Sequence, residues 1–254
     1  MWRHRRRLTQ LELAHDSRVS ARHLSFVETG RAHPTREMIL HLSEQLDIPL
    51  RQRNEMLLAG GLAPAYPEHQ LTEAPMSAVN AAIDQILEAH NPYPAVVVDR
   101  HWELVAANDA TDLLLEGAAG HLLEPPVNVL RLSLHPEGMA GRILNLQQWR
   151  AHILARLERQ IHATGDPTLA VLLEDLRALP GGADLHPHDH PHDHSLVVPL
   201  RCRVRDHELS LFSMTTMFGT PLEVTVSELA IESFYPADTQ TAHILRALHE
   251  DRAV

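Results

Sequence analysis

The sequence of 254 residues contains no lysine, and all 22 of its basic residues are arginine. Every cationic contact is therefore made by a rigid, planar guanidinium group rather than by a flexible ammonium group. Cys202 is the single cysteine, which excludes an intramolecular disulfide, and we expect a reducing, cytoplasmic location. Aromatic residues make up only 4% of the chain, but hydrophobic residues make up 44%, which is enough for the cores of one or two globular domains.

Long apolar runs and familiar catalytic motifs are also missing. No apolar segment reaches the roughly 20 residues needed to span a membrane, and no signal-like apolar region follows the arginine-rich start. The chain has no G-x-S-x-G nucleophile motif and no glycine-rich phosphate-binding loop. Three acidic residues near the end, Glu228, Glu232 and Asp238, are interpreted as solvated rather than as an acid–base pair. We therefore predict neither a membrane protein nor an enzyme.

The net charge of −11 would by itself argue against a nucleic-acid partner, but the charge is unevenly distributed. Residues 1–53 contain ten arginines and six acidic residues, whereas residues 54–254 contain twelve arginines and 27 acidic residues. A cationic start on an acidic remainder is typical of a protein that docks on DNA by one end while the rest is repelled from the duplex.

Residues 5–36 contain the start and stop signals of two short helices joined by a tight turn. Thr9 and Glu12 form a capping box at the start of the first helix, and Ser20 can cap the second. Arg18 stands in the turn between them, where a left-handed backbone would cost a residue with a side chain about 1 kcal/mol. This is the pattern of a helix-turn-helix.

The second of these helices offers several side chains for base contacts. Because Leu24 turns inward, the outer face consists of Ala21, Arg22, Ser25 and Phe26. Arg22 can form a bidentate contact with guanine, Ser25 can reach a base edge or a phosphate, and Phe26 or Ala21 can touch a thymine methyl group. The alternative for Phe26 is burial in a groove between helices. The arginines suited to flanking phosphates are Arg3, Arg5, Arg6, Arg7, Arg31 and Arg36.

The remaining pattern divides the chain into a helical head (residues 1–62), a proline-rich linker (63–75) and a second domain (76–254). In the second domain, two short strands precede a run of helices that includes a long helix over 140–163, and three strands follow. The strands are expected at 95–99, 102–108, 195–204, 208–218 and 223–236. This order predicts an α+β protein in which an all-α head precedes a PAS-like domain with a five-stranded antiparallel sheet and helices.

A histidine-rich tract occupies residues 186–194 of a long loop at 180–195. Its imidazole groups suit zinc, nickel or copper, and the candidate ligands are His186, His188, His190, His192 and His194. A metal site needs ligands in a fixed geometry. This tract follows Pro180-Gly181-Gly182, which is typical of a loop without regular structure, so a fixed geometry is not expected. We therefore interpret it as a disordered, solvated loop with adventitious metal affinity.

Several segments resemble known families. TQLELA, VSARHLSFVETGR and PTREM resemble the XRE-type, lambda-repressor-like helix-turn-helix family. NPYPAVVVDRHWELVAAN, PPVNVLRLSLHPEGMAGRILNLQQW and ELSLFSMTTMFGTPLEVTVSELAIESFYPAD resemble the ligand-binding domain of MmyB-like transcription regulators. The first resemblance implies operator binding, with Gln10 at a phosphate. The second implies a PAS-like cavity for a small apolar molecule, a fatty acid in some members.

Candidate ligand-binding residues come from the segments expected to enclose that implied cavity. From the helices they are Arg131, His135, Arg142, Trp149 and Arg150, and from the strands and their ends Asn108, Phe212, Met214 and Phe218. An arginine facing the cavity could pair with a ligand carboxylate, and the alternative is an ion pair with an acidic residue of the body. Alternating apolar residues are also typical of an ordinary core.

We therefore predict a one-component transcription regulator that binds a double-stranded DNA operator and responds to a small apolar or amphipathic effector, without a cofactor. A single head buries too little surface for useful specificity, so we expect a homodimer on a palindromic operator. One alternative is a metal-responsive or metal-handling protein that uses residues 186–194. A further alternative is a hydrolase with a regulatory head.

Overall fold

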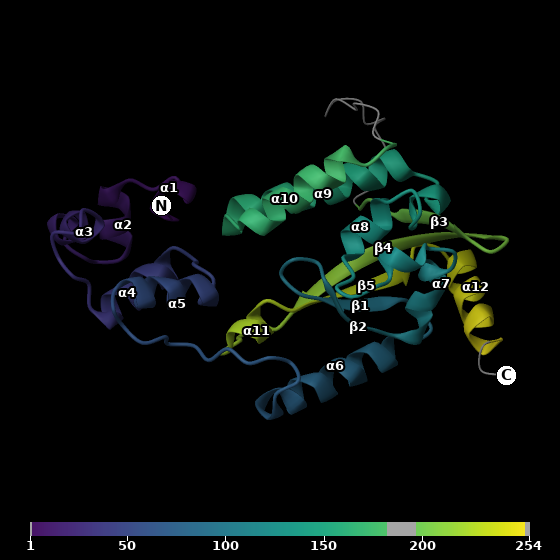
Figure 1. The fold of residues 1–254 in the computed structure, drawn as a ribbon, viewed down its shortest axis with the longest axis horizontal. Coiled ribbons are helices and arrows are strands. Elements are labelled where there is room, and N and C mark those ends of the chain that lie inside the picture. Colours follow the sequence, from purple (N-terminus) through teal and green to yellow (C-terminus); the bar gives the residue numbers. More distant parts are fainter. Residues whose placement is uncertain (1, 182–196, 252–254) are drawn as a thin grey trace.

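The computed structural model describes residues 2–181 and 197–251. A helical head stands beside a larger body, and Figure 1 shows the head at the left. The helices of the head are α1 (Trp2–Arg5), α2 (Gln10–Asp16), α3 (Ala21–Glu28), α4 (Arg36–Gln45) and α5 (Leu50–Ala59). Leu13, Leu24, Leu42 and Ile48 belong to the core of the head, which is distinct from the cores of the body.

Local caps explain where the head helices begin. Thr9 and Glu12 form the predicted capping box, with 3.2 Å from Glu12 N to Thr9 Oγ1 and 2.7 Å from Thr9 N to Glu12 Oε2. Ser20 caps α3 and Thr35 caps α4, each accepting a backbone N–H of the first turn. Arg18, in the turn between α2 and α3, has a φ of 53°, so its backbone is left-handed at a cost of about 1 kcal/mol.

The linker is attached to both parts of the protein. Asn54 of α5 accepts the N–H of Ala65 (2.9 Å) and donates to the carbonyl of Tyr66 (2.8 Å). Further along, the carbonyl of Pro67 accepts the N–H of Val224 in the body (2.9 Å). The linker therefore has partners on either side before η1 (Ala74–Met76) begins the body.

The body is built on one antiparallel sheet in the order β2-β1-β5-β4-β3. The strands are β1 (Ala95–Val98), β2 (Leu104–Ala107), β3 (Leu200–Val204), β4 (His207–Met217) and β5 (Ala230–Pro236). Because β1 pairs with both β2 and β5, the first and last parts of the body meet inside the sheet. This arrangement confirms the predicted α+β fold with a five-stranded antiparallel sheet.

Helices cover both faces of the sheet (Figure 1). One face packs against α6 (Ser77–His90), and the other against α8 (Val129–Leu134), α9 (Leu146–Thr164) and α10 (Pro167–Ala178). Besides α8, four short elements lie between β2 and α9: η2 (Asp109–Thr111), α7 (Asp112–Leu115), η3 (Gly120–Leu122) and η4 (Ala140–Arg142). After β5, helix α12 (Thr239–Glu250) follows.

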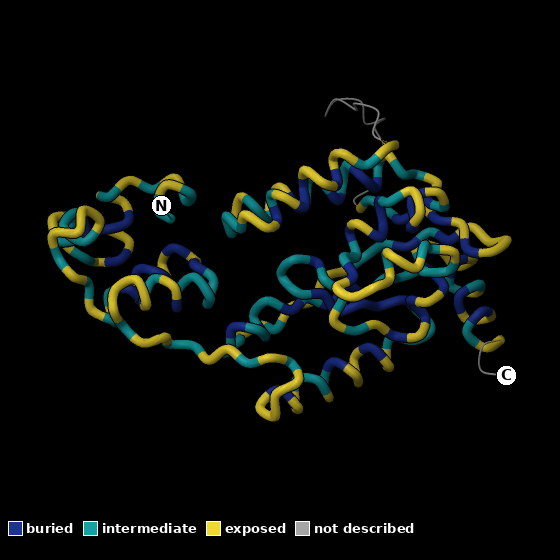
Figure 2. Tube along the Cα trace, in the orientation of Figure 1, coloured by how far each residue is buried: buried dark blue, intermediate teal, exposed yellow. Residues whose placement is uncertain are grey.

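Alternating residues divide the sheet between two cores. On β1, Val96 and Val98 join the core beneath α8–α10, whereas Ala95 and Val97 join the core beneath α6. Figure 2 shows the buried residues along the sheet and on the inner sides of α9 and α10. Within residues 2–181 and 197–251, no helix has both the length and the apolar character needed to cross a membrane.

Two predicted elements differ from the structure. The helix predicted over 140–163 is interrupted, because Ile143 bridges to Cys202 of β3 and Asn145 accepts the N–H of Arg201 (3.0 Å). The strand predicted over 223–236 starts with a short helix, α11 (Val224–Ser227), which the side chain of Glu223 caps. Both differences arise from contacts or caps that compete with the local strand or helix preference.

Candidate DNA-binding face and ligand cavity

Helix α3 lies at the end of the head that is farthest from the body (Figure 1). Arg22 is exposed there, and its guanidinium carbon lies 5.4 Å from the ring centre of Phe26, which is half-buried. Leu24 is buried in the head, as predicted. Arg22 is therefore open to solvent, as its predicted contact with a DNA groove requires, and the ring of Phe26 supports its guanidinium by a cation–π contact.

The other residues predicted on this surface have varied positions. Ser20 accepts a backbone N–H as the cap of α3 (3.4 Å), and Ala21 packs against the core of the head. Ser25 is half-buried on α3. Gln10 Nε2 donates to Glu28 Oε2 (2.6 Å), so the amide would have to leave this carboxylate before it reached a phosphate.

Two of the arginines predicted to contact phosphates instead tie α1 to the rest of the head. Arg3 donates to both carboxylate oxygens of Glu28 at the end of α3 (2.8 and 3.1 Å). Arg6 donates to the carbonyls of Leu46 and Asp47 at the end of α4 (both 2.8 Å). A guanidinium fork satisfies carbonyls that a helix terminus leaves without partners. These bonds give the four-residue α1 its attachment.

Arg36 and Arg5 are also engaged. Arg36 donates to a linker carbonyl (2.7 Å), and Arg5 lies where a side chain at Gly165, between α9 and α10, would stand. Arg7 and Arg31 are exposed. The predicted set of six phosphate-binding arginines is therefore reduced, because four of its members contact the protein itself.

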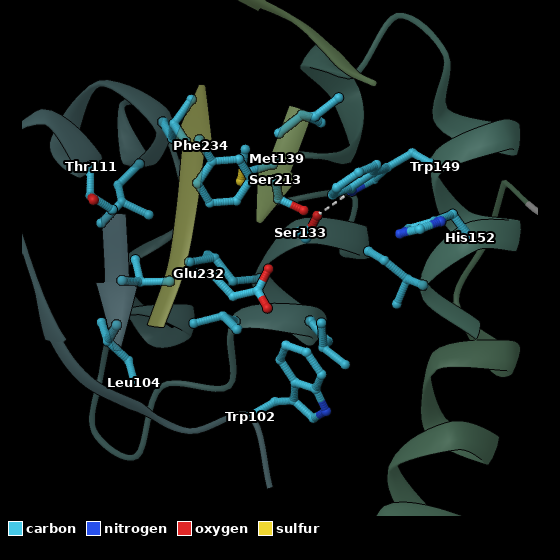
Figure 3. A pocket seen from close by; sticks show the side chains of 18 of the residues that line it. Trp102, Leu104, Thr111, Ser133, Met139, Trp149, His152, Ser213, Glu232 and Phe234 are labelled. Atoms are coloured by element: carbon cyan, nitrogen blue, oxygen red, sulfur yellow. Dashed lines mark hydrogen bonds between the residues drawn. The ribbon is translucent and has the colours of Figure 1, made fainter. Parts of the chain in front are cut away.

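An apolar cavity of about 90 Å³ lies between the sheet and helices α8 and α9 (Figure 3). Its lining is mainly aliphatic and aromatic and includes Trp102, Leu104, Met139 and Trp149. Small-molecule sites in proteins usually measure roughly 300–1,000 Å³. A ligand of that size would have to separate α9 from the sheet, whereas a much smaller molecule would not.

An ion pair between a buried carboxylate and a half-buried arginine forms the polar part of this cavity. Glu232 of β5 is only 4% exposed, and Figure 3 shows its carboxylate among the lining side chains. It accepts hydrogen bonds from Thr215 Oγ1 (2.6 Å), from Arg156 Nη1 (3.1 Å) and from Arg156 Nη2. The Arg156 guanidinium also lies 4.4 Å from the centre of the Trp102 ring. The expectation that Glu232 is solvated is wrong, because Glu232 faces inward with its β5 neighbour Phe234.

Two further polar side chains lie beside the ion pair. Burial lowers the pKa of His152, and the positive charges of Arg156 and Arg159 lower it further, which favours the neutral imidazole. The His152 ring stacks on Trp149 with 5.6 Å between centres. Ser133 Oγ accepts the indole N–H of Trp149 (3.0 Å), which is the dashed line in Figure 3. The cavity thus offers neutral hydrogen-bonding groups next to one compensated ion pair.

Of the predicted ligand-binding residues, Trp149 lines this cavity. Asn108 instead accepts the N–H of Ala95 at the start of β1 (2.9 Å). Arg142 and Arg150 donate to backbone carbonyls (2.6 and 2.8 Å). These three residues stabilise loops and helix ends, so the prediction that they contact the cavity's ligand is not supported.

The remaining candidates lie elsewhere. Arg131 forms a surface ion pair with α10 (2.7 Å) beside a second hollow of about 350 Å³, and His135 stands at the end of α8. Phe212 stacks on an aromatic ring of β5, Met214 is 53% exposed, and Phe218 packs against the core beneath α6. The prediction that Phe212, Met214 and Phe218 line the cavity is wrong, because the odd-numbered residues of β4 face α9.

The structure also bears on the metal hypothesis. The histidine tract 186–194 lies outside the described residues. Among the described residues, His121, His135 and Glu137 place one ligand atom each within 4.8 Å of one another. The N–H of Glu137 donates to His135 Nδ1 (3.1 Å), so the neutral imidazole carries its proton on Nε2, and neither ring nitrogen offers a free lone pair to a metal in this arrangement. This group of side chains is therefore a weak candidate for a metal centre.

A charged cluster connects the head to the body. Arg51 of α5 donates to both oxygens of Glu228, next to α11 (2.8 and 2.9 Å), and pairs with Glu68 of the linker (2.6 Å). Arg100, in the β1–β2 turn, donates to the same Glu228 carboxylate (3.3 Å). The side chains of Arg51 and Glu228 are 22% and 16% exposed, so the prediction that Glu228 is solvated is also wrong. The hydrogen bonds that Arg51 donates to Glu228 raise the pKa of Arg51 and favour its charged form.

The β1–β2 turn also reaches the cavity. Trp102 lines the cavity and donates from Nε1 to Gln160 Oε1 (2.8 Å), while Gln160 Nε2 donates to the carbonyl of Arg100 (3.0 Å). Trp102 has a φ of 68°, a left-handed backbone that costs a bulky residue roughly 1–2 kcal/mol. Packing and this hydrogen bond hold the strained turn between the cavity and the charged cluster.

Sequence reasoning missed the residues that form the polar part of the cavity. Glu232 lies two residues before Phe234 in a strand, and this period-of-two spacing was a usable signal for an inward carboxylate. Arg156 and His152, one helical turn apart on α9, supply the opposing charge and a neutral imidazole. Their pairing with β5 depends on how α9 crosses the sheet, which local sequence does not specify.

The fold and these two sites define a regulator in which a helix-turn-helix head is joined to a separate ligand-binding domain. Residues 79–248 match the MmyB-like transcription regulator ligand binding domain, and residues 2–52 match a helix-turn-helix family. The chain belongs to the family of MmyB-like transcription regulators, and it is a DNA-binding transcription regulator. Both matching families are regulatory rather than enzymatic.

Other comparisons add little. No curated protein matches the chain. One similar solved structure is described as "Structure of an RNA-binding Light-Oxygen-Voltage Receptor", with 15% sequence identity and a TM-score of 0.26. The match covers 96% of this chain and 56% of that one. A likeness at this level supports no conclusion about fold or function.

Proposed function

We propose that the protein is a one-component regulator that reads a DNA operator with the outer face of α3 and responds to a molecule in the cavity beneath α9. The observation that carries the proposal is the exposed Arg22 on a helix-turn-helix whose far side adjoins a ligand-binding domain. Arg22 supplies a bidentate guanine contact, and Arg31 supplies a phosphate contact. The protein would act in the cytoplasm, where its operator is.

The effector is proposed to be small and apolar or amphipathic. This proposal is supported by the cavity, which is lined mainly by aliphatic and aromatic side chains and has a few polar groups around Glu232 and Arg156. A fatty acid is the effector that the family resemblance suggests, and it is the first compound to compare with others. The proposal includes no bound cofactor.

The effect of ligand binding would reach the head through the β1–β2 turn. Trp102 lines the cavity, and Arg100 in the same turn shares the Glu228 carboxylate with Arg51 of the head. A ligand that moves Trp102 would therefore change the geometry of the Arg51–Glu228 contact. The response is limited by the ligand's preference for one of the two arrangements.

The protein is proposed to bind its operator as a homodimer. A single short recognition helix contacts only a few base pairs, so two heads on a palindrome are needed for useful specificity. The half-sites would lie about 10 base pairs, or a multiple of this, apart.

The experiment that tests this function starts from selection of bound sequences out of random duplex DNA by the purified full chain. We expect enrichment of a palindrome, and fluorescence anisotropy should then show that a cavity ligand changes affinity for it. Recovery of sequences no different from the starting library would contradict operator recognition. Unchanged affinity with the cavity demonstrably filled would contradict the regulatory role of the ligand.

A further inference from the structure

We propose that the cavity selects a small neutral amphiphile, with a hydroxyl or amide head that donates a hydrogen bond to Glu232, over the corresponding carboxylate. This inference rests on the proposed function, because it names the chemical class of the molecule in the same cavity. Among the described lining residues, the charged groups are Glu232 and Arg156, and their charges cancel. A ligand with a full charge would therefore enter a site that supplies no counter-charge of its own.

Glu232 is the reason why a carboxylate is disfavoured. It is 4% exposed and already receives both terminal nitrogens of Arg156. A second carboxylate could bind Arg156 only by taking these donors from Glu232 or by standing beside it. Either outcome leaves a buried negative charge without sufficient compensation, which is costly in a site of low dielectric constant.

The same geometry leaves room for a neutral donor. A carboxylate offers about four lone-pair directions, and three of those on Glu232 are used by Arg156 and Thr215. A hydroxyl or amide N–H can occupy the fourth without displacing the ion pair. Neutral His152 and Ser213, which also line the cavity, can bond the oxygen of the same head group.

The size of the cavity restricts the length of the ligand's apolar chain. At about 90 Å³ the space suits a short or partly inserted chain, since larger ligands must move α9 from the sheet. A matched series of eight-carbon compounds therefore isolates the head group: octan-1-ol, octanoate and octylamine share one tail and differ in charge.

The test measures binding of these three compounds to the full chain by isothermal titration calorimetry at pH 7.5. We expect octan-1-ol to bind at least tenfold more tightly than octanoate. In Glu232→Gln, Arg156 no longer has its carboxylate partner. The affinity for octanoate should then rise at least tenfold, and the difference in affinity between octan-1-ol and octanoate should become smaller or change sign. Glu208→Gln is the matched control, because Glu208 is an exposed residue of β4 and should leave all three affinities unchanged.

The outcomes separate this inference from the proposed function. Octanoate binding as tightly as octan-1-ol, or tighter, would overturn the inference while leaving the cavity as the effector site. Tightest binding of octylamine would also overturn it, since the site would then select cations. If none of the three binds, both the inference and the assignment of the effector site fail. The wild-type comparison stands even if Glu232→Gln does not fold.

Discussion

At the scale of single residues, the DNA contacts proposed for Arg22 and Arg31 are of two kinds. Arg22 is exposed on the outer face of the helix, stacked on Phe26, whereas Arg31 is exposed beyond the end of the helix. The stacking contact limits the rotamers of Arg22 and so orients its guanidinium before binding. Arg31 has no such neighbour on α3 and suits a backbone phosphate.

Arg22→Ala should therefore relax sequence preference, with a loss of about 1–3 kcal/mol of discrimination at the base that it reads. Arg31→Ala should weaken binding to operator and random DNA alike and lower the slope of log K against log salt concentration by about 1. Binding isotherms on both DNAs at several salt concentrations measure both effects. Equal losses on operator and random DNA for Arg22→Ala would remove its assigned role.

Cys202 reports on the integrity of the body. It is buried on β3, and burial raises the pKa of its thiol to about 11. At pH 8 only about one thiol in a thousand is then ionised, and the thiolate is the reactive form. We expect iodoacetamide to modify Cys202 slowly in the native protein and rapidly in urea, with mass spectrometry as the readout. Rapid native labelling would mean that β3 opens readily.

At the scale of elements, the attachment of α1 shows arginine used as a structural residue. Arg3 of α1 donates a hydrogen bond to Glu28 at the end of α3, and this bond lowers the pKa of the Glu28 carboxyl group. A carboxyl group with a lowered pKa in the folded state stabilises the fold above its unfolded pKa, and this contribution disappears as the pH falls through the folded value.

Arg3→Ala should therefore destabilise the head by up to about 1 kcal/mol at pH 7, a small value because Glu28 is 30% exposed and solvent screens the pair. The part of this difference that comes from Glu28 should shrink as the pH falls below the unfolded pKa of the carboxyl group, and it should vanish once the pH lies below the lowered folded pKa, where Glu28 is protonated in both proteins. This stability difference can be measured by hydrogen exchange of peptides from residues 2–28, corrected for intrinsic exchange rates at each pH. Arg7→Ala, an exposed neighbour, is the control. A pH-independent difference would exclude the Glu28 pair as the cause.

Elements with strong local signals were predictable from the sequence. The capping box at Thr9, the cap at Ser20 and the alternating strands are properties of neighbouring residues, so the helix-turn-helix and the five strands followed from them. The break at Ile143 did not, because it depends on a bridge to Cys202, 59 positions away. The same holds for the cavity: Glu232 and Arg156 become partners only when α9 lies across the sheet.

At the scale of the whole molecule, charge has two separate uses. The excess of arginine in residues 1–53 predicted a DNA-binding head, but several of those arginines hold the head together or join it to the body. Arg51 is the clearest example, since it binds Glu228 of the body and Glu68 of the linker. Net charge along a sequence therefore indicates the class of partner better than it identifies the contacting residues.

The Arg51–Glu228 contact should determine how firmly the head is held against the body. In Arg51→Gln or Glu228→Gln, the loss of a partly buried, bidentate ion pair should cost about 1 kcal/mol, a roughly fivefold loss of hydrogen-exchange protection in α5 and α11. If the two residues act through their mutual contact, the double variant should lose little more than either single variant. The equivalent pair of Gln substitutions at the exposed Arg203 and Glu208 should leave α5 unchanged. Additive losses in the double variant would show that Arg51 and Glu228 act independently. The effect of a ligand in the cavity would then have to reach the head through other contacts, such as that of Arg5 with the α9–α10 turn.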